Sequence, residues 1–135
     1  MAYSGFLVKV GEDEIKADKF IKAQSYKVTL NVQDLDSYRD ANGVLHRTAL
    51  THRVSKVEFE TPAMLTNTDM SELFATIRKN YTVEAERRFI GTVYIPEMDD
   101  YITQDMYMPD PAFTIYGIFD GVIKYNPVRI AFIAY

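Results

Sequence analysis

The stretch QDLDSYRDANGVLHRTAL, residues 33–50, decides how this chain folds, because it joins two runs that read as β-strands. The first run, SYKVTLN at residues 25–31, alternates apolar and polar side chains, and ALTHRVSKVEFE at residues 49–60 ends in the same way. Between them lies Asn42-Gly43, a strong hairpin signal, since both central residues of a type I′ turn need a positive φ. The stretch is therefore predicted to be the far end of a β-hairpin that turns at these two residues.

The register of this hairpin follows from the position of its turn. With the turn centred there, opposed residues have numbers that add up to 85. Tyr26 then lies opposite Phe59, and Val28 likewise lies opposite Val57. Alternation alone assigns these four side chains to the inner face, in agreement with the turn. We therefore predict one long β-hairpin over about residues 24–61.

A hairpin of this length does not fit within the body of a small domain. Each limb has up to about 17 residues and a length of roughly 50 Å, whereas a chain of 135 residues has a radius of gyration of about 14 Å. The tip must therefore leave the body, or the arm must bend. Leu50 and Val54 have the wrong parity for the inner face, and a bulge near Ser55 or Lys56 would reconcile them.

An arm of this kind is expected to need a partner. An isolated hairpin is marginally stable in water, and its free edges invite pairing with another chain. The simplest partner is a second copy of the protein, and a head-to-tail contact repeated around an axis closes into a ring. The candidate residues of this subunit contact are Tyr38, Arg39, Asn42, Gly43, Leu45 and Arg47.

One helix is predicted, over about residues 69–80, DMSELFATIRKN. Asp69 followed by Glu72 three residues later resembles a capping box, and Thr68 is an alternative N-cap. An apolar stripe at helical spacing predicts a surface helix lying on a sheet. The stripe is formed by Met70, Leu73, Phe74, Ile77 and Tyr81.

The remaining chain reads as further strands, at residues 5–10, 82–95, 100–108, 112–119 and 122–135, with Asp120-Gly121 as a second hairpin turn. The expected fold class is therefore mainly β: an antiparallel β-sandwich with one flanking helix and one long hairpin. Its length predicts a single domain over residues 1–135.

The composition excludes several classes of protein. The net charge is −4 and the pI about 5.1, with basic residues scattered among acids, so tight binding of nucleic acid is not expected. The absence of cysteine excludes a disulfide framework and a thiolate metal site. No apolar run approaches the roughly 18 residues of a membrane helix, and the start MAYSGFLVKVGEDE does not read as a signal peptide. We expect no membrane association.

The acidic hairpin tip does not match a calcium loop. Asp34, Asp36 and Asp40 offer carboxylates at suggestive spacings. An EF-hand loop, however, needs glycine at its sixth position and glutamate at its twelfth, where this chain has Arg39 and Leu45. A solvated hairpin with charge pairs across its strands is the prediction.

No other pattern predicts a catalytic, metal or cofactor site. His46 and His52, the only histidines, lack partners at ligand spacing, so solvent-facing or hydrogen-bonded roles are predicted. The acidic runs GEDE and EMDD fall at predicted turns. The run YMPDPAF, with Tyr107, Met108 and Phe113, can line a ligand site but is interpreted as core. We expect a protein that is not an enzyme and binds no cofactor.

Several runs resemble a known family. They are QDLDSYRDANGVLHRTALTHRVSKVEFETP, LTNTDMSELFATIRKNY, YITQDMYMPDPAFTIYG and RIAFIAY, which together cover nearly the whole chain. They resemble small proteins encoded in the tail-gene clusters of long-tailed bacteriophages and prophages of Gram-positive hosts. The resemblance implies a distal-tail or tail-tube fold, which is a β-sandwich with one helix and a long hairpin that reaches a neighbouring subunit. Copies of that fold form hexameric rings around a DNA channel.

The resemblance implies a structural role in the virion tail, after assembly in the host cytoplasm. The expected function is that of a ring-forming distal tail or baseplate component, which joins the tail tube to the hub and surrounds the DNA without binding it specifically. Its partners would be copies of itself and the tube, tape-measure and hub proteins. Typical distal tail proteins are longer, so this chain has room for the ring-forming domain only. The alternatives are a tail-tube or tail-completion protein and, from another class, a small carbohydrate- or ligand-binding β-sandwich.

Overall fold

The computed structural model of the protein describes residues 2–135, and all of its strand pairs are antiparallel. The strands are β1 (Val8–Val10), β2 (Asp13–Glu14), β3 (Lys27–Thr29), β4 (Tyr38–Arg39), β5 (Leu45–His46), β6 (Lys56–Glu60), β7 (Leu65–Thr66), β8 (Arg88–Ile95), β9 (Asp100–Tyr107), β10 (Ile115–Phe119), β11 (Val122–Tyr125) and β12 (Arg129–Ala134). The helical segments are α1 (Ala17–Phe20), α2 (Asn67–Arg78) and the 3-10 turns η1 (Ala23–Ser25) and η2 (Glu84–Glu86). The expectation of a mainly β, antiparallel fold with one helix is confirmed for the described chain, with α2 as its one long helix.

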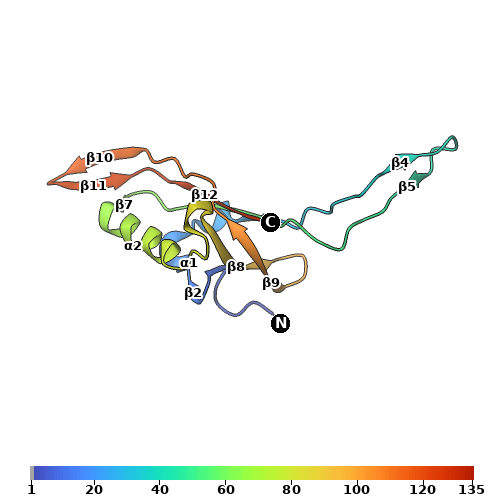
Figure 1. Ribbon diagram of the computed structural model, residues 1–135. Coiled ribbons are helices and arrows are strands. Elements are labelled where there is room, and N and C mark those ends of the chain that lie inside the picture. The colour runs from blue at the N-terminus through green and yellow to red at the C-terminus, as the bar shows by residue number, and fades with distance from the viewer. Residues whose placement is uncertain (1) are drawn as a thin grey trace.

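Three sheets divide the strands. Seven form the main sheet in the order β2-β1-β8-β9-β12-β6-β3, three form the sheet β10-β11-β7, and β4 and β5 form a separate ribbon. Figure 1 shows β4 and β5 at the end of a long arm that leaves the body. The β10–β11 hairpin lies on the opposite side of the body, beside α2 and β7. The molecule therefore carries two projections that point away from each other.

The main sheet buries one of its faces. Buried and partly exposed residues alternate along β6 and β8, as expected for a sheet covered on one side. Phe132 in β12 is fully buried, and its ring meets the rings of Phe89 at 4.9 Å and Phe59 at 5.9 Å edge-to-face. The helix covers this core with the residues Met70, Leu73, Phe74 and Ile77, four of the five stripe residues that the sequence predicts.

The helix α2 begins slightly earlier than the sequence predicts. Thr66 is the N-cap: its hydroxyl accepts a hydrogen bond from the Asp69 N–H at 3.2 Å, and the Asp69 carboxylate accepts one from the Thr66 N–H at 3.2 Å. This is a complete capping box, with an acid three residues after the cap. The bond from the Thr66 N–H lowers the pKa of the Asp69 carboxyl. The prediction that Asp69 or Thr68 starts the helix is therefore wrong, because Thr66 offers its hydroxyl to the third helical residue.

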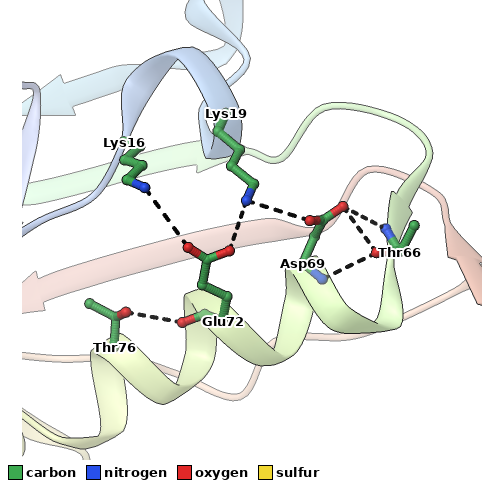
Figure 2. A network of polar contacts seen from close by, with 6 residues as sticks. All are labelled: Lys16, Lys19, Thr66, Asp69, Glu72 and Thr76. Carbon is green, nitrogen blue, oxygen red and sulfur yellow. Dashed lines mark hydrogen bonds and ion pairs between the residues drawn. The ribbon is translucent and has the colours of Figure 1, made fainter.

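The Glu72 side chain, predicted to close a capping box, instead ties α1 to α2. Figure 2 shows it reaching toward Lys19 in α1 and Lys16 just before it: Glu72 lies 2.7 Å from Lys19 and 3.9 Å from Lys16. Lys19 also lies 3.5 Å from Asp69. The pKa of Glu72 is lowered, mainly by its hydrogen bond with Lys19. This exposed network holds the short α1 turn against the first turn of the long helix.

The cap assignment gives a direct prediction. We expect Thr66→Ala to lower the free energy of unfolding by about 1 kcal/mol, because the Asp69 N–H loses its acceptor. Thr68→Ala is the matched control, since Thr68 is exposed and lies two residues after the cap, and it should change stability by less than about 0.5 kcal/mol. Urea denaturation measures both changes. Equal losses in the two variants would contradict the assignment.

Most of the predicted strands are shorter than expected, and one of them divides. Residues 82–87 do not extend β8, because η2 forms a tight turn and Arg87 adopts a left-handed φ of 53°. The predicted strand over residues 122–135 divides into β11 and β12, which belong to different sheets. It breaks at Pro127, which has no N–H for a ladder bond, and the Val128 N–H binds the Thr61 hydroxyl at 2.9 Å.

The second predicted hairpin turn is confirmed. Asp120 and Gly121 both have positive φ values, 52° and 76°, and Phe119 pairs with Val122 across them. Positive φ at both central residues is the signature of a type I′ turn, which suits the twist of a two-stranded hairpin. The turn therefore fixes the tip of the β10–β11 hairpin.

Candidate functional site: a projecting hairpin arm

The base of the long hairpin has the register that the sequence predicts. Val28 pairs with Val57, and the flanking residues of β3 and β6 pair in the same register. Both valines pack in the hydrophobic core, where Val57 is fully buried and Val28 is partly buried. Tyr26 lies just outside the paired strand, where its hydroxyl donates to the Tyr94 carbonyl at 2.8 Å. The pairing at the base is thus fixed by burial on one face.

The register changes twice between the base and the tip. Asp34 bridges to Ala49, so the returning limb has two more residues than the outgoing limb between this bridge and the base. Near the tip Tyr38 pairs with His46, so between the Asp34 bridge and this pair the outgoing limb has one residue more than the returning limb. Asp36 lies in this stretch and has a φ of 93°. The bulge predicted near Ser55 or Lys56 therefore appears as an irregularity spread over residues 50–55.

The tip is a three-residue loop, so the predicted type I′ turn at Asn42 and Gly43 is wrong. The Gly43 N–H binds the Asp40 carbonyl at 3.0 Å, and only Gly43 of the two has a positive φ, 78°. The reason is the Asp40 side chain, which accepts hydrogen bonds from the N–H groups of Asn42 at 2.9 Å and Val44 at 3.0 Å. A one-residue-longer loop satisfies these donors, as in Asx-type turns.

Polar contacts across the limbs hold the distal part of the arm together. The Arg47 guanidinium donates to both oxygens of Asp34, with the shortest distance 2.8 Å, which lowers the pKa of Asp34 and raises that of Arg47. The Asp40 carboxylate contacts His46 Nε2 at 2.9 Å, and this contact lowers the pKa of Asp40. The His46 ring stacks on Tyr38 at 4.9 Å. The predicted cross-strand charge pairs are therefore present.

The base of the arm is fastened to the main sheet. Gln104 in β9 donates to the Arg53 carbonyl at 2.7 Å and contacts the Ser55 hydroxyl. His52 Nε2 contacts the main-chain oxygen of Tyr135. These contacts set the direction in which the arm leaves the body. His52 therefore makes a hydrogen bond, as His46 does with Asp40, and the predicted hydrogen-bonded role of both histidines is confirmed.

The six candidate interface residues lie together on the distal arm. Tyr38 and Arg39 form β4, Leu45 begins β5, and Arg47 follows it, with the other two in the turn. Every residue from 31 to 52 is exposed except Asp40, so no core supports this segment. The arm nevertheless carries apolar side chains that the body does not cover, and two of them are among the six candidates. These side chains are Val32, Leu35, Tyr38, Val44, Leu45 and Leu50.

A second exposed apolar surface was not predicted. The interpretation of Phe113 as core is wrong, because this ring is 46% exposed, while Met108 is buried. The adjoining hairpin also exposes large side chains on both faces of β10 and at the start of β11. They are Ile115, Tyr116, Ile118, Phe119 and Val122. The sequence shows only that β10 contains no charged residue to mark a solvent face, which does not distinguish a strand of the core from a strand that another subunit covers.

Within residues 2–135, no three His, Cys, Asp or Glu side chains lie together in a group that could hold a metal ion. Asp34 and Asp40 are instead engaged by Arg47 and His46. In the same part of the chain, no helix is long and apolar enough to cross a membrane.

Solved structures share this fold, while no curated protein matches the sequence. One structure is a chain from the virion of a native gene transfer agent (GTA) particle, with a TM-score of 0.55 and 14% identity, covering 97% of this chain and 91% of that chain. Another is a chain from the tail of an empty GTA particle, obtained by helical refinement with C6 symmetry. It has a TM-score of 0.54 and 14% identity, and the match covers 99% of this chain and 95% of that chain. At this identity the likeness shows the fold alone.

These matches agree with the tail-protein fold that the resemblance implies. They give no support to a Gram-positive host or to a particular kind of tail protein. Over residues 1–135 the chain belongs to the family described as "Family of unknown function (DUF6711)".

Proposed function

We propose that the protein is a structural subunit of a phage-type tail, in which six copies form a closed ring around a channel for DNA. The observation that carries the proposal is the arm, a segment of about residues 31–52 with exposed apolar side chains and no core of its own. A monomer gains nothing from such a segment, because its free edges and apolar surface are an aggregation hazard. A neighbouring copy that covers the arm removes that hazard.

The shared fold supports both the location and the symmetry. The matched chains come from a GTA virion and from a GTA tail with C6 symmetry. An arm on one side of each subunit suits a head-to-tail contact, and such contacts close into a ring when the rotation permits. The C6 symmetry of the matched tail and the head-to-tail contact together support a ring of six copies.

At the finer level, we propose a distal tail or baseplate component that joins the tail tube to the hub. The second candidate is a tail-tube subunit, which the match to a helically refined tail favours. In either place the role is mechanical, without catalysis or a cofactor. The net charge of −4 suits a channel through which DNA passes without being held.

The oligomeric mass tests the proposal. We expect size-exclusion chromatography with light scattering to give a particle about six times the 15.5 kDa mass of one chain. A carbohydrate-binding β-sandwich would instead elute as a monomer or trimer and bind glycans on an array. A monomeric mass at every concentration would contradict the ring, and glycan binding in addition would favour the carbohydrate-binding alternative.

A further inference from the structure

The β10–β11 hairpin is a second unpartnered surface, at the other end of the molecule from the arm (Figure 1). β10 is the edge strand of its sheet, since it pairs with β11 alone. Both of its faces are exposed, since the adjacent residues Ile118 and Phe119 point to opposite faces and are 64% and 51% exposed. An apolar, uncharged edge strand is a template for pairing with another chain, and natural proteins rarely leave one uncovered.

A groove beside the hairpin extends this surface toward α2. It has a volume of about 780 Å³, and Met70 and Phe74 from α2 line it together with Phe113 and Tyr125 from the hairpin side. Arg78 also lines it. The groove therefore offers apolar walls with charge nearby, which suits a short amphipathic segment.

We propose that the groove and the β10–β11 hairpin receive the arm of the adjacent copy. This inference rests on the ring proposed above and names the surface that the arm occupies. A closed ring of more than two copies needs contacts between two different surfaces of the subunit, because a surface that pairs with its own copy stops at a dimer. The arm and the β10–β11 hairpin are the two large apolar projections of the described chain, and they point in opposite directions (Figure 1).

The charges of the two surfaces are complementary. On the arm, Arg39 donates only to the Gly43 carbonyl, and Asp36 has no ion-pair partner among residues 2–135. On the hairpin, Asp120 at the turn and Lys124 in β11 also have no ion-pair partner within the described chain. The arm and the hairpin thus each present one cation and one anion without an ion-pair partner, and Arg78 and Glu84 of the groove also form no ion pair within the described chain. The opposite surface can neutralise these charges.

The absence of cysteine allows a clean crosslinking test on the whole protein. Leu45→Cys marks the arm and Ile118→Cys marks the hairpin, both at exposed side chains. The two single variants carry tags of different mass, are mixed and allowed to exchange subunits, and are treated with a flexible bis-maleimide that tolerates small differences in position. Met98→Cys replaces Ile118→Cys in the matched control, because Met98 is similarly exposed but lies in the turn at the far end of β8.

We expect the arm–hairpin pair to give a mixed-mass crosslinked dimer at least about tenfold more abundant than the control pair, because docking raises the effective concentration of the two thiols. A variant carrying both cysteines should form a series of crosslinked oligomers of increasing mass, up to the mass of the complete ring. If light scattering still shows rings, two results would overturn the docking surface: crosslinking of Ile118→Cys to itself, or a mixed-mass dimer yield equal to that of the control pair. A monomer by light scattering would overturn the ring and the docking surface together.

Discussion

Replacing residues 36–47 with a two-residue Asn-Gly turn should convert the ring into folded monomers. The replacement is compatible with the backbone, because the Leu35 N–H already binds the Thr48 carbonyl at 2.8 Å, so a tight turn closes the shortened arm there. The removed residues contribute no side chain to the hydrophobic core. We therefore expect unchanged circular dichroism and thermal unfolding, with the light-scattering mass of one shortened chain, slightly below the 15.5 kDa of the full chain.

Point substitutions on the intact arm separate lost apolar contact from added charge. Leu45→Asp should weaken the ring, because it places a carboxylate where the arm is expected to be buried by a neighbour. Thr48→Asp is the matched control: it adds the same charge at an exposed polar position of the same arm. Rings that survive the arm replacement, or that respond equally to both substitutions, would contradict the arm as the subunit contact.

Phe132→Ala should cause the largest loss of stability. Its ring is fully buried between Phe59 and Phe89, at the centre of the main sheet. Truncating a buried phenylalanine removes its packing and leaves a cavity, at a cost of about 3–5 kcal/mol. This is a large part of the stability of a typical domain, so we expect a lower urea midpoint and loss of rings through unfolding.

The neighbouring Ile133→Ala serves as the control, since Ile133 lies on the other face of β12 and is only partly buried. Its loss should be clearly smaller, measured in the same urea titration. Similar losses in the two variants would contradict a core confined to one face of the main sheet. Phe132→Ala also contrasts with the arm replacement, because the first should unfold the protein and the second should not.

The sequence predicts those parts of the fold that burial on one face determines. Val28 and Val57 pair as expected, because shifting the register by one residue would turn both out of the core. The helix stripe is recognised for the same reason, since four of its five residues are buried. The helix start was missed because Thr66, Thr68 and Asp69 are all acceptable caps, and the choice depends on where β7 ends.

The candidate site is predictable in place but not in detail. Nothing buries the arm tip, so local hydrogen bonds alone decide its turn, and the Asp40 carboxylate favours a longer loop than Asn42-Gly43 suggests. The β10–β11 surface was missed for a different reason. An apolar run such as Ile115–Phe119 looks the same in a sequence whether a core or another subunit covers it.

Negative-stain images of the purified protein test the central claim most directly. We expect class averages of closed rings with sixfold symmetry and a central hole, because each arm reaches the neighbouring subunit and the contact repeats around one axis. Images containing only particles of the size of a single chain, or open filaments without closed rings, would contradict the claim that this chain forms a tail ring.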